Sequence, residues 1–170
     1  MERKLSKIYT SYAILFFTFI IPLVSAFSND KNQISSYYDL VKVVDGDSLE
    51  INNQRIRLTG IDAPEFLQTC KNNKNKKYKC GLTSTNFLKN LLKDKTITCN
   101  VHNKDQYDRL LCTCYANDID INKEMVKQGQ AIAYLESQYY QDQDYAKKHK
   151  LGIWDGDFIH PRLFRRLHEK

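Results

Sequence analysis

Three short clusters of charged residues hold the groups best able to do chemistry. They are residues 44–48 (VDGDS), 57–65 (RLTGIDAPE) and 105–110 (DQYDRL). Each cluster alone has an ordinary explanation: an Asp-Gly hairpin turn, an acid that caps a turn, or a surface ion pair. Together they place acids and arginines at three strand boundaries, where cleavage of a phosphodiester could use them.

Hydrolysis of a phosphodiester brings water to the phosphorus atom while negative charge grows on the phosphoryl oxygens. A hard cation held by two carboxylates and a backbone carbonyl can polarise the phosphate, a role that suits Asp47 and Asp62. The guanidinium groups of Arg57 and Arg109 can hold oxygens with paired hydrogen bonds. A further carboxylate, Glu65, can deprotonate the water. The five residues fill these roles without surplus.

The strands and helices that must position these residues can be predicted from the sequence pattern. Short alternating segments predict strands over residues 41–45, 48–51, 55–58, 96–101 and 110–115. Apolar spacing and glycine stops predict helices over residues 83–92, 122–129 and 138–150. A helix between the third and fourth of five strands predicts an α+β fold, a five-stranded OB-type β-barrel with three helices.

The length of 170 residues fits one domain once the N-terminal segment is set aside. We predict a signal peptide over residues 1–26, a flexible arm over 27–37 and an OB-fold domain over 38–170. Hydrophobic and charged fractions of 42% and 27% exclude wholesale disorder and a multi-span membrane protein. The net charge of +6 favours polyanionic partners without identifying one.

Export is indicated by the start of the chain. Basic residues at positions 3, 4 and 7 precede an apolar stretch over residues 13–24, which Pro22 interrupts before small residues at the expected cleavage site. The alternative is a signal anchor that is retained. Cleavage predicts a secreted or periplasmic protein, a monomer without stable membrane association.

Five cysteines, all after the signal segment, favour disulfides in an oxidising compartment. Cys70 and Cys80 bracket a Lys/Asn-rich stretch with no apolar pattern, and we pair these two. Cys99 ends one predicted strand, while Cys112 and Cys114 lie on the next with the same side-chain parity. Alternation therefore leaves the partner of Cys99 open. The absence of a CxxC pair makes a zinc site a weak hypothesis.

The same clusters resemble the staphylococcal nuclease family. Its pattern V-x-D-G-D-[TS], R-L-x-G-I-D-[AT]-P-E, D-x-Y-G-R, Q-G-x-A and G-[IL]-W occurs here in order, at compatible spacing, over about residues 38–166. Members of this family cleave DNA and RNA endonucleolytically with calcium and leave 3′-phosphates. The resemblance therefore implies a Ca²⁺-dependent endonuclease whose partner is DNA or RNA.

The resemblance also implies a role for each matching residue. Asp47, Asp62 and the main-chain carbonyl of Ala63 would bind calcium, and Glu65 would be the general base. Arg57 and Arg109 would bind phosphate, and Tyr107 and Tyr134 would lie around the nucleotide. Exported relatives with a cysteine-bracketed insertion imply a Cys99–Cys114 disulfide, which leaves Cys112 as a buried free thiol.

One residue departs from the family pattern. Asp108 stands where the family has glycine before its second arginine. Its carboxylate could neutralise Arg109 or point away from it. Neutralisation would favour the alternative function, a non-catalytic OB-fold module that binds nucleic acid or protein in the cell envelope. The presence of all five chemical residues favours the enzyme.

Overall fold

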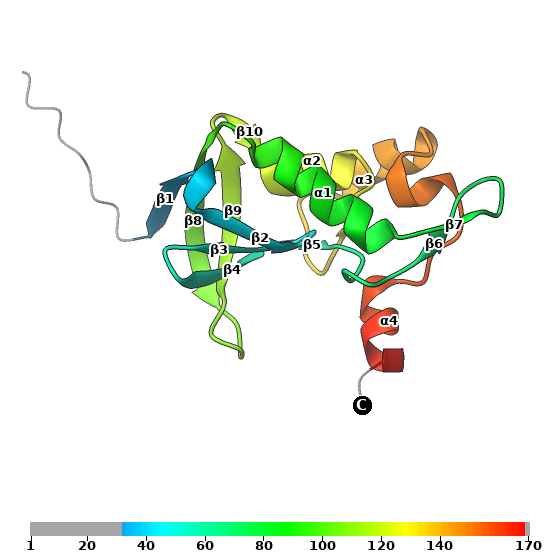
Figure 1. The fold of residues 1–170 in the computed structure, drawn as a ribbon, viewed down its shortest axis with the longest axis horizontal. Helices are drawn as coiled ribbons and strands as arrows, with labels where there is room; N and C mark the ends of the chain where they lie inside the picture. The colour runs from blue at the N-terminus through cyan, green and yellow to red at the C-terminus, as the bar shows by residue number, and fades with distance from the viewer. Residues whose placement is uncertain (1–31, 169–170) are drawn as a thin grey trace, which may run out of the picture.

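The computed structural model describes residues 32–168, in which one curled mixed sheet forms one side of the molecule, at the left of Figure 1. Its strand order is β1-β8-β9-β4-β3-β2, with β10 paired to β9. The strands are β1 (Gln33–Tyr37), β2 (Val41–Asp45), β3 (Ser48–Ile51), β4 (Gln54–Leu58), β8 (Thr96–Lys104), β9 (Leu110–Ala116) and β10 (Ile119–Asp120). The expected signal peptide lies outside the described residues.

The central connections have the topology of an OB-like fold. Strands β2, β3 and β4 form an antiparallel meander, and β4 then pairs in parallel with β9, with Ile56 opposite Leu110. The β3–β4 turn uses Asn52 and Asn53 at φ of 51° and 63°, the left-handed pair that a tight hairpin favours. Parallel pairing places the loop before β9 beside the start of β4, where Arg55 donates to the carbonyl of Tyr107, so the third charged cluster lies next to the strand on which the second begins.

Helices pack over one side of the sheet (Figure 1). They are α1 (Cys80–Leu92), α2 (Ile121–Lys127) and α3 (Tyr140–Lys148), and α4 (Pro161–His168) stands apart from them. Short 3₁₀ turns cover Tyr38–Leu40 (η1) and Gly152–Asp155 (η2). Leu88 and Leu92 of α1 and Met125 of α2 are fully buried against the sheet. This core holds the strand ends that carry the charged clusters.

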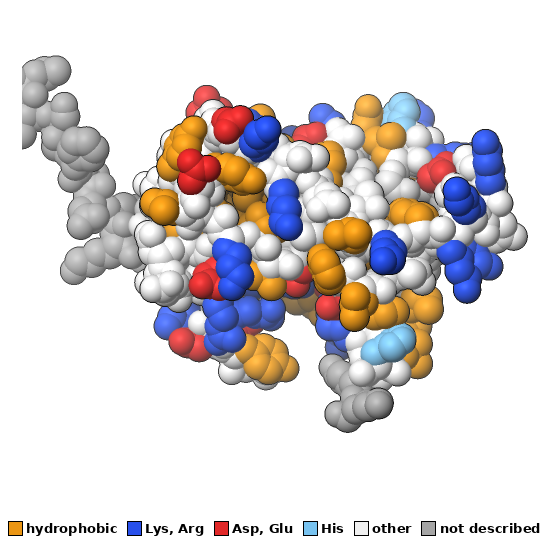
Figure 2. Space-filling view, viewed as in Figure 1, with side chains coloured by type: hydrophobic (Ala, Val, Ile, Leu, Met, Phe, Trp, Pro, Cys, Tyr) orange, Lys and Arg blue, Asp and Glu red, His pale blue; other side chains and the backbone are white. Residues whose placement is uncertain are grey.

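Two small strand pairs complete the fold. β5 (Ile61–Asp62) pairs with β11 (Ile132–Ala133), and β6 (Cys70–Lys71) pairs with β7 (Lys77–Tyr78). The β6–β7 hairpin is closed by the predicted Cys70–Cys80 disulfide. Figure 2 shows Lys and Arg side chains gathered around this end of the molecule. The insertion is therefore a covalently closed, basic hairpin.

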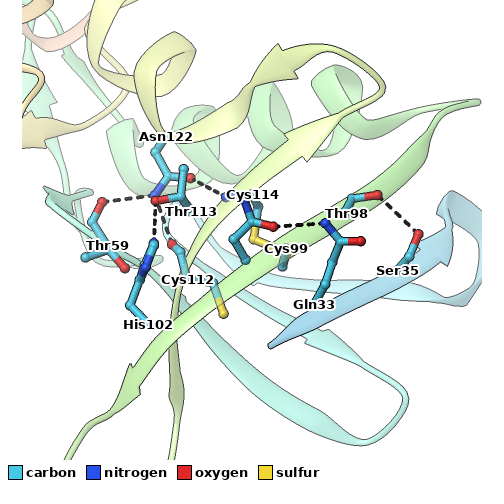
Figure 3. Close-up of a disulfide and its surroundings, with 11 residues drawn as sticks. Gln33, Ser35, Thr59, Thr98, Cys99, His102, Cys112, Thr113, Cys114 and Asn122 are labelled. Atoms are coloured by element: carbon cyan, nitrogen blue, oxygen red, sulfur yellow. Dashed lines mark hydrogen bonds between the residues drawn. A yellow bond between two sulfur atoms is a disulfide. The ribbon is translucent and has the colours of Figure 1, made fainter. Parts of the chain in front are cut away.

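The second disulfide joins Cys99 to Cys114, which are register partners on β8 and β9 (Figure 3). Cys112 is a buried free thiol. The pairings and the free cysteine implied by the family resemblance are therefore confirmed. Burial raises the pKa of Cys112 to about 11, so this thiol stays protonated at neutral pH.

Asn122 of α2 lies beside this disulfide and connects the helix to the sheet (Figure 3). Its amide nitrogen donates to the carbonyl oxygens of Thr59 at 2.9 Å and Cys112 at 3.1 Å. Its amide oxygen accepts from the N–H of Cys114 at 3.1 Å. One buried side chain thus satisfies three backbone groups and fixes α2 against the end of β4.

The mixed α+β architecture is confirmed, and three details of the prediction are wrong. Residues 33–37 form strand β1 on the edge of β8 rather than a flexible arm. Their polar side chains pair across the ladder, as in the bond of 3.0 Å from Gln33 to Asn100, so low hydrophobicity did not prevent a strand. The sheet exceeds five strands, and a fourth helix, α4, begins at Pro161. In the described residues, no helix is long and apolar enough to cross a membrane.

Candidate active site

An open groove of about 1010 Å³ lies between the end of β4, the β8–β9 loop, the segment after β11 and α4. Six arginines line it: Arg55, Arg57, Arg109, Arg162, Arg165 and Arg166. Three acids also line it, namely Asp45, Glu65 and Asp105. The excess of guanidinium groups makes the groove attractive to a polyanion.

Asp47 lies beneath this groove at the β2–β3 turn and is 2% exposed. Its carboxylate accepts hydrogen bonds from the N–H of Ala63 at 2.7 Å and from the hydroxyl of Ser48 at 3.1 Å, and it forms an ion pair with Arg57. The turn needs Gly46, because a Cβ there would lie 2.1 Å from the hydroxyl oxygen of Ser84 on α1. Glycine thus lets the turn pack against α1 with Asp47 facing inwards.

Asp62 of β5 is completely buried beside Asp47. Its Oδ1 accepts from Arg57 Nη2 at 2.9 Å and from Arg165 Nη1 at 2.9 Å, and its Oδ2 accepts from Arg165 Nη2 at 3.2 Å. Arg57 therefore bridges the two buried carboxylates while its side chain also lines the groove.

Burial is the largest influence on the pKa values of Asp47 and Arg57. It raises the pKa of Asp47 above its ordinary range, and Asp45 and Asp62 add to the rise, while Arg57 and the N–H of Ala63 oppose it. Burial works to lower the pKa of Arg57, but Asp47 and Asp62 raise it further, so Arg57 stays charged. For Asp47, the effect of burial outweighs that of the positive charge beside it.

Glu65 follows Pro64 at the edge of the groove, with its side chain 33% exposed. Its Oε1 accepts from Arg165 Nη1 at 2.6 Å. Its backbone N–H donates to Gln68 Oε1 at 3.2 Å. The carboxylate is thus accessible from the groove. Arg165 links it to buried Asp62, because it donates to both groups.

Arg109 belongs to a tight loop organised by Asp105. Asp105 Oδ1 accepts from the N–H groups of Tyr107 and Arg109, both at 2.9 Å, and Oδ2 accepts from Arg109 Nε at 2.7 Å. The guanidinium carbon of Arg109 lies 5.6 Å from the ring centre of Tyr107, a cation–π contact. The loop therefore holds an arginine and an exposed aromatic ring together at the groove.

Asp108 does not contact Arg109 through its side chain. It adopts φ of 60°, the left-handed conformation that glycine takes easily, and its Oδ1 accepts from Lys104 Nζ at 2.7 Å. The acid that pairs with Arg109 is Asp105, which the sequence pattern had placed only as part of the cluster. Of the two alternatives predicted for Asp108, the structure shows the second: its carboxylate points away from Arg109.

Tyr134 lines the opposite side of the groove, and its backbone N–H donates to the carbonyl of Gly60 at 3.0 Å. The structure therefore brings Arg57, Glu65, Arg109, Tyr107 and Tyr134 to one groove, with Asp47, Asp62 and Ala63 directly beneath it.

The donor atoms suit a hard divalent cation. Arg57 bonds to the carboxylates of both Asp47 and Asp62, so their oxygens lie close together, and the backbone of Ala63 reaches the same place through its N–H bond to Asp47. Within residues 32–168, no three His, Cys, Asp or Glu side chains gather as a metal site. A cation here would take its remaining ligands from backbone oxygens, water or substrate, as calcium and magnesium do.

Sequence reasoning missed the contribution of α4. Arg162, Arg165 and Arg166 all line the groove, and Arg165 reaches both Asp62 and Glu65. The signal was present in the run PRLFRR, where proline can begin a helix and arginines spaced three and four apart share one face. Arg55, which donates to the carbonyl of Tyr107, was also missed.

Known proteins match the chain over the same region. A family profile described as "Staphylococcal nuclease homologue" matches residues 55–156. An "Uncharacterized endonuclease" of Escherichia coli O157:H7 is 36% identical over 138 residues, which cover 74% of this chain and 82% of that protein. An "Uncharacterized endonuclease" of Haemophilus influenzae is 34% identical over 170 residues, which cover 94% and 85%. A "Probable endonuclease lcl3" of Botryotinia fuckeliana is 27% identical over 141 residues, which cover 73% and 52%.

Proposed function

This chain belongs to the staphylococcal nuclease family and is a nuclease, and we propose that it is a calcium-dependent endonuclease of DNA or RNA. One observation carries the proposal. Arg57 links the buried carboxylates Asp47 and Asp62 at the floor of an arginine-lined groove, with Glu65 at its edge. A groove of this kind combines a cation site, phosphate-binding groups and a base for water.

In the proposed reaction, Asp47, Asp62 and the main-chain carbonyl of Ala63 hold the calcium ion. When bound, the ion supplies Lewis-acid polarisation of the phosphate. Arg57 and Arg109 bind phosphoryl oxygens and oppose the charge that grows on them. Arg57 lies on β4 and Arg109 directly precedes β9, the parallel neighbour of β4, which supports their acting on one phosphate.

Glu65 is the proposed general base. Its carboxylate accepts the proton from the attacking water, a contribution worth about 10²- to 10⁴-fold in rate. Its partial exposure gives water and substrate access to it.

The proposed substrate contacts extend along the groove. Tyr107 is 61% exposed beside Arg109, and Tyr134 lines the other side. Aromatic rings next to arginines suit the alternating bases and phosphates of a single strand. We therefore propose that both tyrosines contact the nucleotide that is cleaved.

The non-catalytic alternative depends on Asp108 neutralising Arg109. The bond from Lys104 to Asp108 removes that support. Two disulfides in the described chain favour an oxidising compartment, and we propose that the protein is exported through its N-terminal segment.

The direct test is cleavage of single-stranded DNA by the purified, oxidised protein with added calcium, followed by chelation with EDTA. We expect cleavage with calcium and none after chelation. Parallel reactions with magnesium or manganese test the choice of cation. A pure, folded protein that cleaves neither DNA nor RNA with any of these cations would contradict the proposal.

A further inference from the structure

The C-terminal segment over residues 157–168 is tied to the turn that carries Glu65. Gln68, which is completely buried, makes the first link. Its Nε2 donates to the carbonyl of Ile159 at 2.6 Å, and its Oε1 accepts from the N–H of Glu65 at 3.2 Å. The N–H of Gln68 also donates to the carbonyl of Glu65 at 2.7 Å. One side chain thus fastens the backbone of the Glu65 turn to the segment that leads into α4.

Arg165 makes the second link, from α4 to the Glu65 side chain. Its Nη1 donates to Glu65 Oε1 at 2.6 Å and to Asp62 Oδ1 at 2.9 Å, while its Nη2 donates to Asp62 Oδ2 at 3.2 Å. The planar guanidinium fixes the angle between the two carboxylates, which a single ammonium group could not do. Glu65 is therefore held relative to the completely buried Asp62.

Only one oxygen of Glu65 takes part in this contact. Among the described residues, Oε2 of Glu65 accepts no hydrogen bond and remains able to take a proton from water. A glutamate side chain that is one-third exposed would otherwise move among several rotamers. Holding one oxygen while leaving the other free is the arrangement that a positioned base requires.

We propose that Arg165 and Gln68 are positioning residues for Glu65, so that the C-terminal segment is a working part of the nuclease site. The inference rests on the proposed role of Glu65 as the base. Arg165 fixes the carboxylate, and Gln68 fixes the backbone that carries it. A catalytic group displaced by about 1 Å can lose about 10²-fold in rate, which makes such links valuable.

The contact with Asp62 has a second consequence for cation binding. The positive charge of Arg165 lies within hydrogen-bond distance of a proposed calcium ligand and repels a cation there. Removing this charge should leave calcium affinity unchanged or increase it. A loss of turnover without a loss of calcium affinity therefore separates positioning from damage to the cation site.

The test compares Arg165→Ala, Arg165→Lys and Arg166→Ala with the wild-type protein. Arg166 is the matched control, because it is an exposed arginine on the same helix that lines the groove without contacting an acid. For Arg165→Ala we expect kcat to fall about 10- to 100-fold with KM within about threefold. Arg165→Lys should recover part of kcat, since lysine can reach one carboxylate. Arg166→Ala should raise KM and leave kcat within about twofold.

Two readouts do not depend on activity. They are calcium affinity, measured by titration calorimetry, and the temperature of thermal unfolding. The proposal expects Arg165→Ala to bind calcium at least as tightly as the wild type. Its unfolding temperature should fall, because buried Asp62 loses one of its two guanidinium partners, but the variant should stay folded at the assay temperature. Wild-type kcat in Arg165→Ala, or an increased kcat, would overturn it. Equal losses of kcat in Arg165→Ala and Arg166→Ala would also overturn it. An inactive wild-type protein would instead contradict the nuclease proposal itself.

Discussion

Two buried polar networks in this protein are built on opposite principles. Asn122 bonds three backbone groups, and every participant is neutral. At the groove, the carboxyl groups of Asp47 and Asp62 bond chiefly to the guanidinium groups of Arg57 and Arg165. The first network connects secondary structure elements, and the second brings like charges together beneath an open groove.

The difference separates packing from function. Burying a neutral amide costs little when all its partners are satisfied. Burying two carboxylates is expensive even with a guanidinium between them, and well-packed apolar residues would stabilise a fold equally well. A costly charged cluster at a cleft is typical of a catalytic or binding site. The comparison therefore assigns the Asn122 network to stability and the Arg57 network to chemistry.

Removing Arg57 should have the largest effect, because this residue both stabilises the buried carboxylates and is proposed to bind phosphate. Arg57→Ala leaves two buried carboxylates without a shared partner, which we expect to cost about 3–5 kcal/mol of unfolding free energy. Loss of a phosphate-binding group should lower kcat by about 10²- to 10³-fold. Denaturant unfolding and cleavage rates measure the two effects.

Arg55→Ala is the control for that experiment, since Arg55 lies on the same strand but is exposed and bonds only to the carbonyl of Tyr107. It should change stability by no more than about 0.5 kcal/mol. Equal stability of Arg57→Ala and Arg55→Ala would refute the view that Arg57 compensates the buried acids.

Asn122→Ala should affect stability alone. The substitution removes the Asn122 partner of the Thr59 carbonyl and the Cys114 N–H, at about 1–3 kcal/mol for each group that water cannot reach, while the Cys112 carbonyl keeps its bond from the N–H of Thr59. Cleavage per folded molecule should stay close to wild type. Thermal unfolding with a matched activity assay measures this, and Asn100→Ala, at an exposed side-chain bond, is the control. A large loss of activity in folded Asn122→Ala protein would erase the distinction between the networks.

Asp108→Gly should have the smallest effect. Glycine adopts the left-handed conformation without strain, a gain of about 1 kcal/mol that loss of the exposed Lys104 pair partly offsets. Cleavage should stay within about twofold of wild type, because the Asp108 carboxylate pairs with Lys104 at an exposed site and not with Arg109. A rise of tenfold or more would show that Asp108 opposes Arg109 after all.

Sequence patterns predicted those parts of the fold that are decided by residues close together in the chain. Alternation located strands β2, β3, β4, β8 and β9, and the Lys/Asn-rich segment between Cys70 and Cys80 identified their disulfide. The partner of Cys99 needed the register between β8 and β9, which parity cannot supply. Strand β1 was missed because polar side chains form its contacts with β8.

The site residues were predictable because turns at strand ends carry them. Arg165 was not, since it reaches Asp62 and Glu65 across about one hundred residues of chain through the docking of α4. The role of Asp105 was equally hidden, because only the loop geometry shows which acid faces Arg109. Spacing can place arginines on one face of a helix, as in the run PRLFRR, but it does not show which distant acids they contact.

Glu65→Gln tests the central claim most directly. The amide keeps the shape of the side chain and can still accept from Arg165, but it cannot take a proton from water. We expect turnover of single-stranded DNA in saturating calcium to fall by about 10²- to 10⁴-fold. Calcium affinity and thermal stability should match the wild type. Turnover equal to wild type in this variant would contradict the account.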